Sequence, residues 1–230
     1  MRDTLPEEIR ALIGNWEMQQ LTIGRSDAQT YKVGDRYLKI APRDSLSRSA
    51  KMQQYLSTKG FTAPVPVFVQ DAEKDYVLAE GVKGTDATKY GPDKALLCRE
   101  MGRAIRRLHD TQASDCPYPD ATELLIKGYE KDEGKPFDGD TSVLERNTLI
   151  HGDCCLPNLI FRDGVFEGFI DFDCAGLGDR HIDLASILWS THYNLKTDEY
   201  DDILLSAYGK EKIDAGKLEL CTRLLGYDKI

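Results

Sequence analysis

The sequence predicts an α+β protein made of a small strand-rich N-terminal part and a larger helix-rich C-terminal part. Between residues 16 and 79 the apolar residues mostly fall in short strand-like runs, whereas from residue 93 onward they recur at helical spacings of three and four. Gly81 and Gly84 separate the two patterns, which places a break near residues 80–84. With 230 residues and 41% apolar content, the chain can bury one large core or two smaller ones.

The strand-rich part opens with a short helix, for which Thr4 and Glu7 form a predicted capping box and Gly14 marks the end. Five strands and one inserted helix follow, because turn residues separate short apolar runs of strand character. The strands are predicted at residues 16–23, 28–33, 36–40, 64–69 and 75–79, and the helix at residues 45–57.

The helix-rich part begins with a long amphipathic helix over residues 93–109, predicted from a single apolar stripe. Residues 183–190 and 218–225 also have helical spacing. The segment 118–140 is predicted to be turn-rich, and it carries seven acidic and three basic residues.

Composition excludes several classes of protein. No apolar run approaches the roughly 20 residues of a membrane helix, and residues 1–10 lack the order of a signal peptide, so we expect a soluble, cytoplasmic protein. The net charge is −9 without a basic block, which predicts no nucleic-acid partner. The six cysteines form no Cys-x-x-Cys pair and the four histidines are scattered, so we expect reduced thiols and no zinc site.

The most informative stretch is the polar loop His151–Asn158, which lies between two short apolar runs. Asp153 and Asn158 are five residues apart, the spacing found in the catalytic loop of protein kinases. There the aspartate accepts the proton of the attacking hydroxyl and the asparagine holds magnesium. A further apolar run, residues 165–170, leads to Asp171, a candidate for the second magnesium ligand. The combination predicts phosphoryl transfer with ATP and Mg²⁺.

Together with further motifs, this loop resembles the aminoglycoside phosphotransferase family, small-molecule kinases that share a protein-kinase-like fold with choline kinases. The likeness is greatest to the aminoglycoside 3'-phosphotransferases and is carried by Thr22–Lys32, Tyr37–Lys39, Ser114–Tyr118, His151–Asn158 and Gly168–Asp171. It implies a two-lobed fold, with an N-terminal nucleotide-binding lobe at residues 1–80, a hinge at 81–84 and a helical C-terminal lobe at 85–230. The lobe at 85–230 would contain the catalytic loop and the substrate site.

The resemblance also implies how ATP, or GTP in its place, would be bound. Lys39 would reach the α- and β-phosphates, and Tyr37 would face the adenine. Ser26 would touch the phosphates, while the backbone of Ala79 to Gly81 would bond the adenine edge.

In the C-terminal lobe the resemblance implies Asp153 as the catalytic base, with Asn158 and Asp171 as the magnesium ligands. Four further residues are expected to support the structure. Asp183 would brace the catalytic loop and Asp179 would cap the following helix, while His151 would fix the loop and His109 would pack or end its helix.

The sequence departs from the family at the expected partner of Lys39. Relatives carry a glutamate in the helix that follows the lysine strand, whereas alignment places Ser49 there and residues 44–59 contain no glutamate. Lys39 is therefore expected to pair with Asp44, to pair elsewhere, or to point differently.

The acceptor side departs as well, because the acidic segment is shorter than in the family and the C-terminus differs. Candidate contacts to a cationic acceptor are carboxylates of this segment and of the tail: Glu123, Glu130, Asp132, Asp228 and the terminal carboxylate of Ile230.

Three functions remain open from the sequence. The first is an ATP- and magnesium-dependent kinase that phosphorylates a hydroxyl of a small cationic molecule, with an aminoglycoside as the first acceptor to test. The second is a kinase of the same fold for an amino alcohol or a sugar, and the third is a nucleotide-binding module with little turnover. In each case we expect a monomer or a weak dimer.

Overall fold

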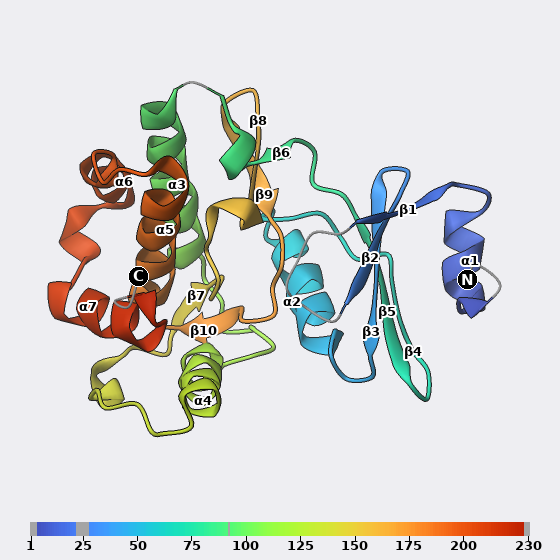
Figure 1. Cartoon of the computed structure of the whole chain (residues 1–230), viewed down its shortest axis with the longest axis horizontal. Coiled ribbons are helices and arrows are strands. Elements are labelled where there is room, and N and C mark those ends of the chain that lie inside the picture. Colours follow the sequence, from blue (N-terminus) through green and yellow to red (C-terminus); the bar gives the residue numbers. More distant parts are fainter. Residues whose placement is uncertain (1–3, 22–27, 92, 228–230) are drawn as a thin grey trace. The chain divides into compact units, whose positions relative to one another are not determined.

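The computed structural model describes residues 4–21, 28–91 and 93–227. The chain divides into two compact units, Met1–Val82 and Lys83–Ile230. Figure 1 labels the helices and strands of both units. The α+β class predicted from the sequence is confirmed.

The first unit is built around a five-stranded antiparallel sheet with the order β1-β2-β3-β5-β4. Its strands are β1 (Met18–Leu21), β2 (Gln29–Val33), β3 (Arg36–Pro42), β4 (Val67–Gln70) and β5 (Lys74–Glu80). The helix α2 (Ser47–Thr58) is inserted between β3 and β4, and α1 (Glu7–Ile13) precedes the sheet. The predicted five strands and inserted helix are therefore confirmed.

Successive side chains of a strand point to opposite faces of the sheet, and apolar side chains pack on both faces. Leu38 and Leu78 pack with Ile9 and Ile13 of α1 in one buried cluster. The opposite face packs against α2 in a second cluster: Ala41, Leu46, Ala50 and Val77. The capping box predicted for α1 is wrong, because the residue before Glu7 is Pro6, whose side chain has no hydrogen-bonding group.

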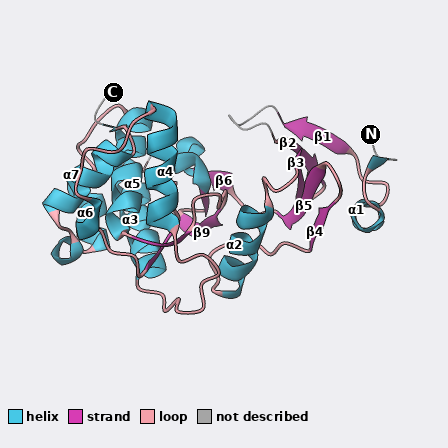
Figure 2. Cartoon of the chain, turned by 90° about the horizontal axis from the view of Figure 1, so that it is seen from below, coloured by secondary structure: helices cyan, strands magenta, loops and turns pink. Residues whose placement is uncertain are grey.

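The second unit is mainly helical. Its helices are α3 (Lys94–His109), α4 (Ala121–Glu133), α5 (Arg180–Leu195), α6 (Asp201–Tyr208) and α7 (Ala215–Leu224). Helix α3 packs against α6, and α5 packs against α7 (Figure 2, where all helices are cyan). Within the described residues, no helix is both long and apolar enough to cross a membrane.

Short strands carry the polar loop of this unit. They are β6 (Thr85–Asp86), β7 (Thr148–Ile150), β8 (Leu159–Arg162), β9 (Val165–Phe169) and β10 (Gly176–Gly178). Strand β8 lies between β6 and β9, while β7 pairs with β10.

The prediction of a turn-rich segment at residues 118–140 is wrong, because α4 occupies most of it. Charged residues and Gly128 mask the helical spacing of the apolar residues there. Those residues pack on the rest of the unit, and the ring of Tyr129 meets that of Phe137 edge to face, with centroids 4.9 Å apart. Burial of this apolar side stabilises the helix despite its mixed composition.

Candidate active site

The polar loop connects two strands that are buried in the second unit. Leu149 and Ile150 at the end of β7 and Leu159 at the start of β8 have no exposed surface. Their burial fixes both ends of the loop, and the 3₁₀ turn η4 (Leu156–Asn158) completes it. Polar side chains that follow a buried strand in this way are held by the core beneath them.

The loop brings Asp153 and Asn158 into direct contact. The Asn158 amide nitrogen donates to the Asp153 carboxylate Oδ2 at 3.0 Å and to the Asp153 backbone oxygen at 2.9 Å. Because the side-chain nitrogen of Asn158 faces Asp153, the side-chain oxygen of Asn158 points away from Asp153. Carboxylate and amide oxygens are ligands that Mg²⁺ prefers.

Asp171 is brought next to Asn158 by the β8–β9 hairpin. The backbone N–H of Ile170 donates to the Asn158 carbonyl at 2.9 Å. Asp171 follows with an exposed side chain and a left-handed backbone (φ 70°). Such a backbone conformation is uncommon for a residue other than glycine and is frequent at functional sites.

His151 holds this arrangement together from inside the core. Its Nε2 lies 3.0 Å from the carbonyl oxygen of Ile170, and its Nδ1 accepts from the Asp153 amide at 3.3 Å. A carbonyl oxygen only accepts, so the ring carries its proton on Nε2. The predicted role of His151 in fixing the loop is confirmed, and the ring ties the peptide preceding Asp171 to the backbone of Asp153.

Gly152 is required by the close approach of another backbone segment. Its φ is +82°, and a Cβ atom at this position would lie 2.3 Å from the carbonyl oxygen of Cys174. A side chain is therefore excluded both by conformation and by space. This explains why glycine, and not the arginine of protein kinases, precedes Asp153.

Asp183 of α5 braces the loop as the sequence predicts. Its Oδ2 accepts from the His151 backbone N–H at 2.8 Å, and its Oδ1 accepts from that of Gly152 at 2.7 Å. Burial by itself would raise the pKa of the Asp183 carboxyl. The hydrogen bonds from His109 and His151 have the larger effect, so the pKa lies below its usual value. Asp183 is thus a buried acceptor for the loop backbone.

Two serines on the same face of α5 extend this support. Ser190 accepts the backbone N–H of Leu156 at 2.9 Å, and the Ser186 hydroxyl lies 3.3 Å from the thiol of Cys155. Asp183, Ser186 and Ser190 follow at spacings of three and four, so one helix face contacts the loop from residue 151 to residue 156.

The sequence did not predict the partners that complete the brace. His109, at the end of α3, bonds Asp183 Oδ2 through Nε2 at 3.1 Å, and its Nδ1 lies 2.9 Å from the Tyr208 hydroxyl of α6. Burial raises the pKa of Tyr208 to about 12, so this hydroxyl keeps its proton and donates to His109. His109 ends its helix as predicted, but it also supports the loop, which no local sequence pattern signals.

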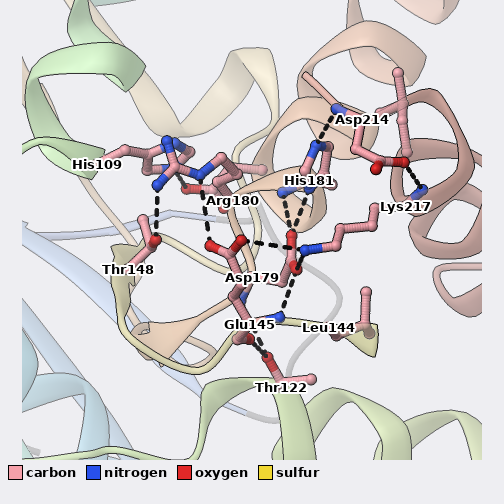
Figure 3. A network of polar contacts seen from close by, with 12 residues as sticks. His109, Thr122, Leu144, Glu145, Thr148, Asp179, Arg180, His181, Asp214 and Lys217 are labelled. Carbon is pink, nitrogen blue, oxygen red and sulfur yellow. Dashed lines mark hydrogen bonds and ion pairs between the residues drawn. The ribbon is translucent and has the colours of Figure 1, made fainter. Parts of the chain in front are cut away.

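Asp179 anchors the start of α5 within a larger polar network (Figure 3). As predicted, it caps the helix, accepting from the His181 backbone at 2.9 Å, and it also accepts from the His181 ring at 2.6 Å and the Glu145 backbone at 2.7 Å. Lys217 of α7 bonds Glu145 at 3.1 Å, and His181 accepts from the Asp214 backbone at 2.8 Å. The network ties α5 and α7 to the segment that precedes β7.

In the first unit, three of the predicted nucleotide-binding residues share one face of the sheet: Tyr37, Lys39 and Ala79. Tyr37 pairs with Ala79 across β3 and β5, and Lys39 lies two residues further along the same strand. The backbone N–H of Gly81 bonds the Asp35 carbonyl at 2.9 Å, and a Cβ atom at Gly81 would lie 2.9 Å from the Tyr37 ring. Ser26 lies outside the described residues.

Two positions, Ser49 and Asp44, bear on the expected partner of Lys39. Ser49 is buried in α2, whose first turn has no acidic residue. Asp44 accepts a hydrogen bond from Gln70 at 2.9 Å and lies 3.8 Å from Arg43. The Asp44 carboxylate is thus engaged by neighbours on its own edge of the unit.

The predicted acceptor contacts on α4 do not form one group. Glu123 is paired with Arg146, whereas Glu130 and Asp132 are exposed. Seven residues separate Glu123 from Glu130, so they lie within about 20° of each other on the helix, while Asp132 is turned about 160° away from Glu130. Asp228 and Ile230 lie outside the described residues.

Three comparisons relate this chain to known proteins. It matches the sequence model of the phosphotransferase enzyme family at residues 17–135 and 138–221. A probable aminoglycoside 3'-phosphotransferase from Lactococcus lactis is 34% identical over 235 residues, covering 91% of this chain and 87% of that protein. An aminoglycoside 3'-phosphotransferase from Niallia circulans is 27% identical over 253 residues, covering 95% of each chain.

The fold is also that of solved structures. An aminoglycoside phosphotransferase from Streptomyces rimosus, in complex with ADP and streptomycin, superposes with a TM-score of 0.70 at 21% identity. The superposition covers 94% of each chain, so the two-part architecture is shared across nearly the full length.

Proposed function

The chain belongs to the phosphotransferase enzyme family, and from that premise we propose that it transfers the γ-phosphoryl group of ATP to a hydroxyl of a cationic small molecule. An aminoglycoside is the first acceptor to test. The observation that carries this proposal is the contact of Asp153 with Asn158, beside the hairpin that presents Asp171. It supplies a base for the attacking hydroxyl and two oxygen ligands for a metal.

In this proposal Asp153 orients the acceptor hydroxyl and takes its proton. The carboxylate is half-buried and held from below, so its direction is set before an acceptor arrives. Preorganisation of this kind lowers the cost of reaching the transition state.

Asn158 and Asp171 would hold Mg²⁺. The orientation of the Asn158 amide fits this role, because its nitrogen is used by Asp153 and its oxygen is directed away. Two protein ligands are sufficient, since Mg²⁺ usually takes its remaining ligands from water and substrate phosphates. When bound, the ion would neutralise charge on the transferred phosphate.

ATP would be bound by the first unit. One face of the sheet would supply the ring of Tyr37 and the ammonium group of Lys39. The backbone groups for the purine edge would come from Ala79 and Gly81. GTP is the alternative nucleotide. Ser26 would add a phosphate contact.

Two observations support an aminoglycoside acceptor. The relatives from Lactococcus lactis and Niallia circulans are aminoglycoside 3'-phosphotransferases by name, and this chain is acidic, with a net charge of −9. Glu130 on α4 and the tail carboxylates at Asp228 and Ile230 are the proposed contacts to its ammonium groups. The pairing of Glu123 with Arg146 reduces the charge that α4 offers, and this favours an amino alcohol or sugar as the alternative acceptor.

The test is ATP consumption by the purified protein with Mg²⁺ and a panel of aminoglycosides, amino alcohols and sugars. We expect consumption that depends on one class of acceptor, with a phosphorylated product identified by ³¹P NMR. The matched control is Asp153→Asn, which keeps the size of the side chain. Tight Mg-ATP binding without transfer to any acceptor would instead favour a nucleotide-binding module.

A further inference from the structure

The thiol of Cys155 lies against the proposed catalytic base. Its Sγ donates to Asp153 Oδ1 at 3.0 Å, while the Asn158 amide bonds Oδ2 at 3.0 Å. The carboxylate is therefore held at both oxygens by different partners. Rotation about its Cβ–Cγ bond would break both hydrogen bonds.

Cys155 is in turn held by two hydroxyl groups. Ser186 of α5 lies 3.3 Å from Sγ, and the Tyr227 hydroxyl is a further polar neighbour of both Cys155 and Ser186. The Tyr227 ring is fixed independently, because it stacks on Trp189 of α5 with centroids 4.4 Å apart and planes 8° from parallel. Tyr227 thus reaches the catalytic loop from beyond the end of α7.

The direction of these hydrogen bonds follows from the protons available. A carboxylate oxygen only accepts, so the Cys155 thiol donates its S–H to Asp153 Oδ1, at 3.0 Å. Burial raises the pKa of Tyr227. The Tyr227 hydroxyl therefore keeps its proton and directs it toward the Cys155 sulfur, whose own S–H is directed toward Asp153.

We propose that Cys155 and Tyr227 are positioning residues for phosphoryl transfer, which together hold the Asp153 carboxylate in the orientation that accepts the proton of the acceptor hydroxyl. The chain of donors from Tyr227 through Cys155 ends on a negative charge, and hydrogen bonds to a charged acceptor are stronger than neutral ones. The inference rests on the proposed function of Asp153 as the base. It adds that Tyr227 acts on the base through Cys155.

The kinetic test uses variants that remove one donor at a time. Cys155→Ala is expected to lower kcat about tenfold with little change in the KM for ATP, since a misplaced catalytic group costs turnover. Cys155→Ser keeps a donor of similar size and is expected to retain kcat within about twofold, because a hydroxyl makes the same bond. Tyr227→Phe keeps the ring stack and is expected to lower kcat about threefold, since it weakens only the far bond of the chain.

The double variant Cys155→Ala, Tyr227→Phe separates a chain from two independent effects. If Tyr227 acts through Cys155, its substitution has no further effect on kcat once the thiol is gone. If the two losses multiply, the proposed chain is wrong. Tyr193→Phe is the matched control for Tyr227, because the Tyr193 ring also stacks on Trp189, at 5.3 Å.

The S–H stretching band gives a readout that does not depend on an acceptor. The difference spectrum between parent and Cys155→Ala isolates the band of this thiol, which is expected at a lowered frequency because its proton is shared with a carboxylate. In Asp153→Ala the Cys155 band is expected to move to higher frequency. Cys116, a half-buried thiol that bonds the Tyr118 carbonyl at 3.5 Å, is the reference, and Cys116→Ala is expected to leave kcat unchanged.

Failure of this inference is distinguishable from failure of the proposed function. If no acceptor is phosphorylated by the parent protein, the proposed function fails, and the S–H band still tests the bond to Asp153. An S–H band that is unchanged in Asp153→Ala would overturn the inference. So would a Cys155→Ala protein that matches the parent in kcat, or one whose lost kcat is not restored by Cys155→Ser at equal folded fraction.

Discussion

The amide of Ile170 donates a hydrogen bond of 2.9 Å to the carbonyl of Asn158, and this bond places the two predicted magnesium ligands on adjoining backbone. Asn158 ends the catalytic loop, whereas Asp171 follows β9 thirteen residues later in the sequence. The hairpin between them, and not the loop alone, therefore determines how far apart the two ligands lie.

Replacing Asp171 by alanine is expected to abolish the magnesium-dependent stabilisation of the protein by ATP. A ligand present at one hundred times its Kd stabilises the folded state by about 2.7 kcal/mol, which is readily seen as a raised Tm. Thermal melts with ATP, in the presence and absence of Mg²⁺, measure the effect. Glu167→Ala, on the same hairpin and paired with Arg162, is the control, and equal protection of Asp171→Ala and the parent would remove Asp171 from the metal site.

Asp153→Asn is expected to lower turnover by about 10²-fold to 10⁴-fold, the range for loss of a general base. Nucleotide affinity is expected to change little, because the substitution preserves volume and Asp153 is not a predicted nucleotide contact. Steady-state kinetics and equilibrium binding of ATP measure the two effects separately. Unchanged turnover would exclude Asp153 as the base.

Gly152→Ala is expected to destabilise the protein by about 2–4 kcal/mol, because it combines an unfavourable positive φ with a steric clash. The added Cβ would lie 2.3 Å from the Cys174 carbonyl oxygen, which belongs to the backbone and cannot rotate away. Gly128→Ala in α4 is the matched control, since a Cβ there meets nothing within 4 Å. This control is expected to stabilise α4 by up to about 1 kcal/mol. Urea unfolding of both variants measures the difference, and a Gly152→Ala protein as stable as the parent would contradict it.

Stability at acidic pH is expected to depend on Asp183. Its folded-state pKa is lowered below the ordinary value of 3.8, so its contribution is fully present above that value and is lost as the pH falls through the lower folded-state pKa. Asp183→Asn is expected to lose about 3 kcal/mol at pH 7, because an amide nitrogen would face backbone donors.

The dependence of the free energy of unfolding on pH below pH 4 also tests the lowered pKa of Asp183. In Asp183→Asn the free energy of unfolding is expected to fall less steeply below pH 4 than in the parent, since one titrating carboxyl is gone. Asp198→Asn, at an exposed position, serves as the control. Parallel acid limbs for Asp183→Asn and the parent would contradict the lowered pKa.

If the acceptor is an aminoglycoside, Glu130→Gln is expected to raise its KM about threefold at low salt and less at high salt, because salt screens exposed charges. Asp132→Asn is expected to have a smaller effect, since helical geometry turns Asp132 to another side of α4. The KM for ATP is the internal control. Equal acceptor KM in the parent and in Glu130→Gln would indicate a solvated surface and favour a metabolite acceptor.

Much of the fold follows from local patterns. The strands of the first unit could be predicted because Gly34 and neighbouring turn residues interrupt short apolar runs. Helix α4 could not be predicted, because packing against distant elements stabilises it and its many acidic residues are typical of a loop sequence. Propensity alone is a weak guide wherever tertiary contacts supply the stabilisation.

The candidate site divides in the same way. Asp153, Asn158 and Asp171 are indicated by spacing and by the strands before them. The contacts of His109 with Asp183, and of Cys155 with Ser186, join residues 74 and 31 positions apart. No sequence window holds both members of such a pair, so these contacts emerge only from the folded chain.

The support of the loop by one face of α5 has a consequence for chain length. Each residue of an α-helix advances the side-chain direction by about 100°. A single insertion between Asp183 and Ser190 would therefore turn one of these groups away from its backbone partner without changing either residue. The β8–β9 turn at Asp163 and Gly164 takes part in none of the hydrogen bonds described above between α5 and the loop. The number of residues separating Asp183 from Ser190 is thus as constrained as their identity, and variation in length is expected at the hairpin turn before it is tolerated in this helix.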